Sequence, residues 1–172
     1  MTPEKTPAEY LDLDWAMFGE LCRALALKVA RDYDPEVIIG IARAGVIPAA
    51  VVSSMMGVDF YAMKISRKDG EDIVRERPAI FSEVPPAVTG KRVLIVDEIT
   101  TSGDTLRLAL AAVRDAHPAE VRTATSFART SGYQPNYAAL TLEANVIFPW
   151  DRQVLQDDEL VINPIYEDEL GD

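Results

Sequence analysis

Apolar and polar positions follow two different periods along this chain, and the pattern predicts helices alternating with strands. Between residues 10 and 30, apolar side chains recur every three or four positions, which is typical of an amphipathic helix. Short apolar runs rich in β-branched residues predict buried strands. The predicted strands are 37–42, 60–65, 79–83, 93–96, 120–128 and 137–142, and the further helices are 48–56 and 104–116. Because strands buried on both faces belong to parallel sheets, we expect an α/β fold whose central, mostly parallel sheet is flanked by helices.

The stretch 93–106 changes character three times. A charge-free run is closed by Asp97 and Glu98, a turn of small and hydroxyl residues follows, and a helical pattern begins at Asp104. Open parallel sheets bind ligands outside the carboxyl ends of their strands, which is where this acid pair is expected. We therefore expect a binding site here.

The chemistry of this stretch indicates the kind of ligand. The turn 100–105 offers successive backbone N–H groups, hydroxyls, the positive end of a helix dipole and Gly103, which can adopt a positive φ. These are the components of a phosphate cradle. Asp97 and Glu98 would repel a phosphate, so we expect them to accept hydrogen bonds from sugar hydroxyls or to hold a divalent metal. A ribose 5-phosphate would fit both, with its phosphate in the cradle and its hydroxyls on the two acids.

A second short loop, Arg43-Ala44-Gly45, follows strand 37–42. The spacing from Gly40 to Gly45 lacks the lysine of a Walker loop and the close glycines of a dinucleotide fingerprint, so both of those sites are excluded. A loop with one arginine between a strand and a helix is as consistent with an anion site as with a plain turn.

Two other segments are less specific. Residues 66–78 carry eight charges and little apolar content, which predicts an exposed, mobile loop. Residues 145–151 form an apolar strand end with two aromatic side chains, for which core packing is the simpler interpretation.

Length and composition predict one domain in a reducing compartment. A chain of 172 residues that is 48% hydrophobic suits a single globular domain with a core. No segment approaches eighteen consecutive apolar residues, and the first residues lack the pattern of a signal peptide. The single cysteine, Cys22, lies in the amphipathic helical pattern and cannot form an internal disulfide. We expect a cytoplasmic protein with no membrane partner.

The net charge of −11 is concentrated at the C-terminal end. Residues 151–172 contain Arg152 and eight acids, namely Asp151, Asp157, Asp158, Glu159, Glu167, Asp168, Glu169 and Asp172. This balance disfavours non-specific nucleic-acid binding, which depends on many basic contacts to phosphate. An anionic substrate must instead meet local cations and a metal.

Three of these segments resemble the type I phosphoribosyltransferases, and the purine enzymes most closely. Residues 93–106 resemble the phosphoribosyl pyrophosphate signature, 41–48 the pyrophosphate loop and 145–151 the base-binding hood. The resemblance implies a phosphoribosyltransferase domain at 1–152, with a flexible lid at 66–78 and a small C-terminal hood at about 137–152. The resemblance itself covers most of residues 30–152, and the N-terminal arm and the acidic tail 153–172 lie outside it.

The resemblance also implies roles for individual residues. Asp97, Glu98 and Arg43 would be catalytic, and Asp97, Glu98 and Asp151 would hold Mg²⁺. The implied substrate-binding residues are Ala44, Gly45, Lys64, Thr100, Thr101, Ser102, Gly103, Asp104, Thr105, Ile147, Phe148 and Trp150, with Arg67 and Lys68 as further cations near pyrophosphate. A cis peptide at Arg43–Ala44 would turn an N–H group toward pyrophosphate.

The implied activity is Mg²⁺-dependent transfer of the phosphoribosyl group from phosphoribosyl pyrophosphate to a nucleobase, with release of pyrophosphate, by a cytoplasmic homodimer. The implied acceptors are the purines hypoxanthine, guanine and xanthine. Thr101 stands where the family has its general base, an aspartate, and Asn145 stands where an aromatic residue stacks on the base. These departures keep a second interpretation open, a regulator that senses phosphoribosyl pyrophosphate with weak or no catalysis. A third is a nucleotide-binding scaffold whose acidic tail recruits a basic partner.

Overall fold

The computed structural model describes residues 9–69 and 73–171, so residues 1–8, the centre of the predicted lid and Asp172 lie outside the described residues. The chain divides into two compact units. One is Leu21–Leu142, and the other combines the two ends of the chain, with described residues 9–20 and 143–171.

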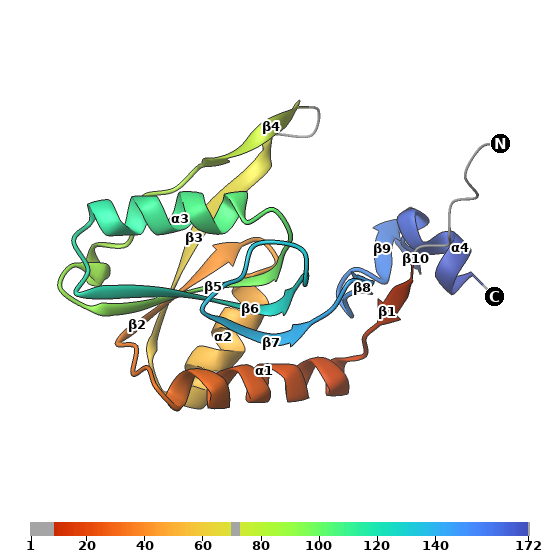
Figure 1. Cartoon of the computed structure of the whole chain (residues 1–172). Coiled ribbons are helices and arrows are strands. Elements are labelled where there is room, and N and C mark those ends of the chain that lie inside the picture. The colour runs from red at the N-terminus through yellow and green to blue at the C-terminus, as the bar shows by residue number, and fades with distance from the viewer. Residues whose placement is uncertain (1–8, 70–72, 172) are drawn as a thin grey trace. The chain divides into compact units, whose positions relative to one another are not determined.

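The unit Leu21–Leu142 is built on a six-stranded sheet with the order β4-β3-β2-β5-β6-β7 (Figure 1). All neighbouring strands in it are parallel except β3 and β4, which are antiparallel. The strands are β2 (Val37–Ala42), β3 (Asp59–Asp69), β4 (Ile73–Ile80), β5 (Arg92–Thr100), β6 (Glu120–Ala128) and β7 (Tyr137–Thr141). The predicted α/β fold with a mostly parallel sheet is therefore confirmed.

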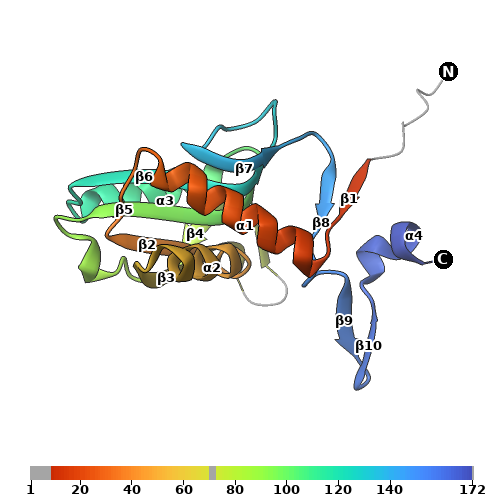
Figure 2. The same ribbon diagram turned by 90° about the horizontal axis from the view of Figure 1, so that it is seen from below.

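Helices cover both faces of this sheet. The helices are α1 (Trp15–Ala30), α2 (Val46–Met56) and α3 (Asp104–Asp115), and a short 3₁₀ turn, η1 (Pro86–Val88), precedes β5. α3 lies over one face, while α2 and the C-terminal half of α1 lie over the other (Figure 2). Leu106, Ala109 and Val113 form one buried face of α3, and they pack on alternate residues of β5 such as Val93 and Ile95.

The strand order reverses between β2 and β5. From β2 the chain crosses through α2 to β3 on one side, and from β5 it crosses through α3 to β6 on the other. Such a reversal of strand order is the switch point at which open α/β sheets bind ligands. The loops that follow β2 and β5 are therefore brought side by side.

Four predicted boundaries are wrong. Residues 10–12 form strand β1 (Tyr10–Asp12), and α1 begins only at Trp15, where the Asp14 carboxylate accepts from the Met17 N–H at 2.7 Å. The segment 66–78 is not an irregular loop, because its described residues belong to the paired strands β3 and β4. The strand predicted at 79–83 is the end of β4, and β5 runs on past its acid pair to Thr100.

The second unit contains the chain ends. Here β1 pairs in parallel with β8 (Asn145–Ile147), and β9 (Gln153–Gln156) forms an antiparallel hairpin with β10 (Glu159–Ile162). A 3₁₀ turn, η2 (Pro164–Tyr166), and a short helix, α4 (Glu167–Leu170), follow. The described part of the acidic tail therefore has regular structure. Across the described chain, the helices are too short or too polar to span a bilayer.

Candidate active site

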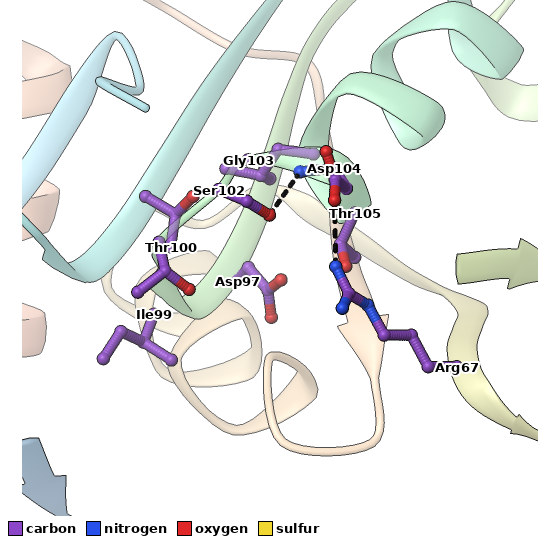
Figure 3. A pocket seen from close by; sticks show the side chains of 10 residues that line it. Arg67, Asp97, Ile99, Thr100, Ser102, Gly103, Asp104 and Thr105 are labelled. Atoms are coloured by element: carbon purple, nitrogen blue, oxygen red, sulfur yellow. Dashed lines mark hydrogen bonds and ion pairs between the residues drawn. The ribbon is translucent and has the colours of Figure 1, made fainter. Parts of the chain in front are cut away.

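The turn between β5 and α3 lines a cavity of about 340 Å³ at the switch point (Figure 3). Gly103 adopts the predicted left-handed conformation, with φ +81°. The lining residues are Arg67, Asp97 and the continuous segment 99–106. The Thr100 hydroxyl is buried and has no hydrogen-bond partner among the described residues.

The backbone of this turn, 100–103, is oriented to receive an anion. Each of its four carbonyl oxygens accepts a hydrogen bond from a residue outside the turn. The donors are the Arg129 N–H to Thr100 (3.2 Å), the Tyr133 N–H to Thr101 (2.9 Å), the Arg107 side chain to Ser102 (2.7 Å) and the Arg107 N–H to Gly103 (2.8 Å). In the described part of the chain, the N–H groups of Ser102 and Gly103 have no acceptor of their own. The carbonyl oxygens of the turn, which would repel an anion, are therefore already hydrogen-bonded. The N–H groups of Ser102 and Gly103 are left to bind a phosphate.

The two acids of β5 differ in their surroundings. Asp97 is 7% exposed and continues the buried row of Val93 and Ile95, whereas Glu98 is half-buried. The Glu98 N–H donates to Asp97 Oδ1 at 3.0 Å. Burial raises the pKa of Asp97 well above its ordinary value, and the neighbouring Glu98 carboxyl raises it further. A cation bound beside this pair would favour the ionised form.

The loop after β2 packs directly on Asp97. A Cβ atom added to Gly45 would lie 2.5 Å from Asp97 Oδ1, so only glycine permits this approach. The loop Arg43-Ala44-Gly45 is therefore brought beside the acid pair. The cis peptide bond lies at Ala42–Arg43, one residue before the predicted Arg43–Ala44 position.

Of the three predicted cations, Arg67 alone lines this cavity among the described residues. Arg67 extends from β3, and its Nη2 atom donates to Asp104 Oδ2 at 2.9 Å (Figure 3). The Lys64 ammonium instead lies over the Phe81 ring, 5.7 Å from its centroid, and Lys68 is exposed. Thr101 and Thr105 line the cavity with the other turn residues.

The residues predicted to bind the base lie in the other unit. Ile147 and Phe148 are buried, and the Phe148 and Trp150 rings stack at 4.6 Å with an interplanar angle of 13°. Phe18 packs edge-on to Trp150 at 4.9 Å. These rings pack on one another as a core cluster would, and their contact with a base stays a prediction.

The donor set suits magnesium held jointly with substrate. No three His, Cys, Asp or Glu side chains within 9–69 and 73–171 lie close enough to form a metal site on their own. Mg²⁺ commonly uses one or two carboxylates together with substrate phosphates and water. Asp97 and Glu98 fit that pattern, while the predicted participation of Asp151 stays a prediction.

Sequence reasoning did not single out Arg107 or Tyr133 as site residues. Arg107 stands one helical turn beyond Gly103, and this spacing is the signal that could have found it. Tyr133 belongs to the connection between β6 and β7, which no local motif ties to the phosphate turn.

Together, the fold, the switch point and the geometry of the turn describe an α/β protein with a candidate anion site. A model of the phosphoribosyl transferase domain matches residues 13–157, and the chain belongs to that family. It is an enzyme of the phosphoribosyltransferase class, similar to the purine enzymes, as its motifs predicted.

Three relatives illustrate the range of similarity. The chain is 29% identical over 158 residues to a xanthine-guanine phosphoribosyltransferase of Gluconobacter oxydans, covering 88% of this chain and 91% of that protein. The crystal structure of a purine phosphoribosyltransferase from Pyrococcus horikoshii superposes with a TM-score of 0.74 at 28% identity, covering 87% and 99% of the two chains. The transcriptional regulator GfcR of Archaeoglobus fulgidus is 36% identical over 77 residues, or 45% of this chain and 39% of that protein.

Proposed function

We propose that this protein transfers the 5-phosphoribosyl group from phosphoribosyl pyrophosphate to a purine base, in a Mg²⁺-dependent reaction that releases pyrophosphate. The observation that carries the proposal is the turn 100–103, whose carbonyls are all bound from behind while the buried acid of β5 lies at the same cavity. Hypoxanthine, guanine and xanthine are the proposed acceptors, since purine substrates are named for the relatives.

The turn and the acid pair divide the work of binding ribose 5-phosphate. The N–H groups of Ser102 and Gly103, with the Thr100 hydroxyl, bind the phosphate. Asp97 and Glu98 accept hydrogen bonds from the two ribose hydroxyls. Their negative charge lies beside the sugar as positive charge develops on its anomeric carbon, which lowers the barrier electrostatically.

Displacement then occurs at that carbon. The bond to pyrophosphate breaks, the bond to a ring nitrogen of the base forms, and that nitrogen loses its proton. Thr101 cannot accept a proton at neutral pH, so the proton passes to water or to the departing pyrophosphate. Arg43 and Arg67 are the proposed cations for pyrophosphate, with Ala44, Gly45 and Lys64 contributing from neighbouring positions.

Asp97 and Glu98 would hold Mg²⁺ with Asp151 as a further proposed ligand, and the ion would supply positive charge to the departing pyrophosphate. Ile147, Phe148 and Trp150 are the proposed base-binding residues. A homodimer in the cytoplasm is the proposed form of the enzyme. Nucleic acid is not a proposed partner, because the net charge is −11.

The test is a panel of bases. Purified protein is incubated with phosphoribosyl pyrophosphate and adenine, hypoxanthine, guanine, xanthine, uracil or orotate, with and without Mg²⁺, and nucleotide is measured by chromatography. We expect nucleotide only with purines and only with Mg²⁺. Formation of none of the six nucleotides by folded protein would contradict the proposal.

A second candidate is a regulator that binds phosphoribosyl pyrophosphate without turning it over. Thr101 at the position of the general base and the similarity of 77 residues to GfcR favour it. Calorimetric binding of phosphoribosyl pyrophosphate by protein that makes no nucleotide would support this candidate over the enzyme.

A further inference from the structure

Two residues outside the phosphate turn 100–103, Tyr133 and Arg107, donate hydrogen bonds to its backbone carbonyls. Tyr133 arrives from the β6–β7 connection and Arg107 from α3, so two separate elements meet on the side of the turn away from the ligand groups. We propose that Arg107 and Tyr133 are positioning residues that keep the N–H groups of this turn facing the 5-phosphate. The inference rests on the proposed function, since it assigns how that same phosphate site is preorganised.

Tyr133 makes two kinds of contact with the turn. Its N–H donates to the Thr101 carbonyl at 2.9 Å. Its ring lies against Gly103 so closely that a Cβ atom added there would collide with the ring. The ring therefore fills the space beneath the one residue whose positive φ turns the chain into α3.

Arg107 holds the next carbonyl and the tyrosine together. Its Nη1 atom donates to the Ser102 carbonyl at 2.7 Å, and its guanidinium carbon lies 4.8 Å from the centroid of the Tyr133 ring. A planar guanidinium suits both contacts, because it can donate in its plane while it stacks on an aromatic face.

The segment that carries Tyr133 is itself closed by local hydrogen bonds. The Gly132 N–H donates to the Arg129 carbonyl at 3.1 Å, and the Gln134 amide donates to the Arg129 and Gly132 carbonyls at 2.8 and 3.1 Å. Gly132 also packs on the Thr101 carbonyl without space for a side chain. Tyr133 is therefore presented from a preformed turn.

The effect on binding follows from peptide geometry. Rotation of the Thr101 or Ser102 peptide would direct a carbonyl dipole at the phosphate in place of an N–H group, changing attraction into repulsion. With both carbonyls already bound from behind, the turn needs no reorganisation when the anion arrives. Neither side chain needs to touch the substrate to have this effect.

Four variants test the proposal. Tyr133→Ala removes the ring and Tyr133→Phe keeps it, while Arg107→Met removes the guanidinium and Arg114→Met removes a matched charge from the last turn of the same helix. Calorimetry measures the affinity for ribose 5-phosphate, kinetics measures kcat and both KM values, and thermal unfolding measures Tm.

We expect Arg107→Met to weaken ribose 5-phosphate binding and raise the KM for phosphoribosyl pyrophosphate by about tenfold, the effect of losing one well-placed hydrogen bond. Tyr133→Ala keeps the backbone N–H that binds Thr101 but removes the ring packed against Gly103, so we expect both values to change in the same direction by more than about twofold. The KM for the purine should stay within about twofold, as should all values for Tyr133→Phe and Arg114→Met. This split between the two KM values would not arise from general destabilisation.

Each other outcome overturns a specific statement. Ribose 5-phosphate affinity within twofold of wild type in both Tyr133→Ala and Arg107→Met would overturn the positioning role while leaving the proposed function intact. If Tyr133→Ala does not fold, the ribose 5-phosphate affinity of Arg107→Met alone tests the proposal, because the Arg107 side chain is exposed and its loss should leave the fold intact. Wild-type protein that neither binds ribose 5-phosphate nor makes nucleotide would overturn the proposed function and this inference with it.

Discussion

Arg67 donates a 2.9 Å hydrogen bond to Asp104 beside the phosphate turn, and this pair places a carboxylate next to the groups that would bind an anion (Figure 3). Asp104 is in the first turn of α3, where a negative charge is favourable with the helix dipole. The two side chains are 46% and 42% exposed, so the pair contributes only about 0–1 kcal/mol to stability. A 5-phosphate bound at the turn would meet the like charge of Asp104.

Asp104→Asn is therefore expected to tighten ribose 5-phosphate binding by about two- to fivefold, the usual effect of one exposed charge. Calorimetry at low and high salt measures it, and the gain should shrink at high salt because screening weakens the repulsion. Asp115→Asn, at the other end of α3, is the matched control and should change little. Weaker binding by Asp104→Asn would mean that its hold on Arg67 outweighs the repulsion.

The strands that were predicted well are those whose burial can be read from their own residues. β2 and β6 have their predicted bounds, 37–42 and 120–128. β2 is an apolar run buried along most of its length, whereas β6 begins with charged residues and is buried from Thr123 to Ala128. The first part of β4, residues 73–78, was predicted as a loop because its charged residues are exposed and its strand conformation comes from pairing with β3. The hairpin β9–β10 was missed for a similar reason, since its turn residues Asp157 and Asp158 adopt positive φ without the glycine that usually signals such a turn.

The candidate site divides in the same way. The phosphate turn could be predicted because strand end, acids, glycine and helix start are contiguous in the sequence. Tyr133 lies thirty residues beyond Gly103 and reaches it through the β6–β7 connection, which no local spacing reveals. The family resemblance predicted a cis peptide in the loop after β2, and the structure has it at Ala42–Arg43, one residue earlier than predicted.

Gly45→Ala is expected to lower the free energy of unfolding by about 1–3 kcal/mol, because its Cβ would overlap Asp97 and neither backbone can move freely. Activity should fall further, since the acid pair is displaced. Gly19→Ala is the matched control, because nothing lies within 4 Å of its Cβ in α1, and it should stabilise the protein by about 0.5–1 kcal/mol. Urea denaturation measures both, and equal effects of the two substitutions would contradict the packing described for Gly45.

Gly103→Ala separates backbone strain from collision when it is compared with Gly90→Ala. Both glycines have positive φ, +81° and +71°, but only Gly103 has a neighbouring ring in the way. Gly90→Ala should cost about 1 kcal/mol of stability and leave ribose 5-phosphate binding unchanged. Gly103→Ala should cost more and weaken binding at least about tenfold, as expected when a hydrogen-bonding turn is displaced. Calorimetry on folded protein checks the second effect, and unaltered affinity in Gly103→Ala would remove the turn from the phosphate site.

Cys22 is expected to be unreactive toward thiol reagents in the folded protein. Its side chain is fully buried in α1, and burial raises its pKa to about 11. At pH 8 an ordinary thiol is about one quarter thiolate, whereas a thiol with that pKa is about one-thousandth thiolate, and the thiolate is the reactive form. A disulfide reagent should therefore label native protein only at the rate of transient opening, and in urea it should label the single thiol of the chain at once.

Because the folded state keeps the Cys22 proton while the unfolded thiol ionises, the free energy of unfolding should fall as pH rises from the ordinary thiol pKa toward 11. Cys22→Ser is the control and should show neither labelling nor this contribution to the pH dependence; rapid labelling of native wild-type protein at pH 8 would contradict the burial of Cys22.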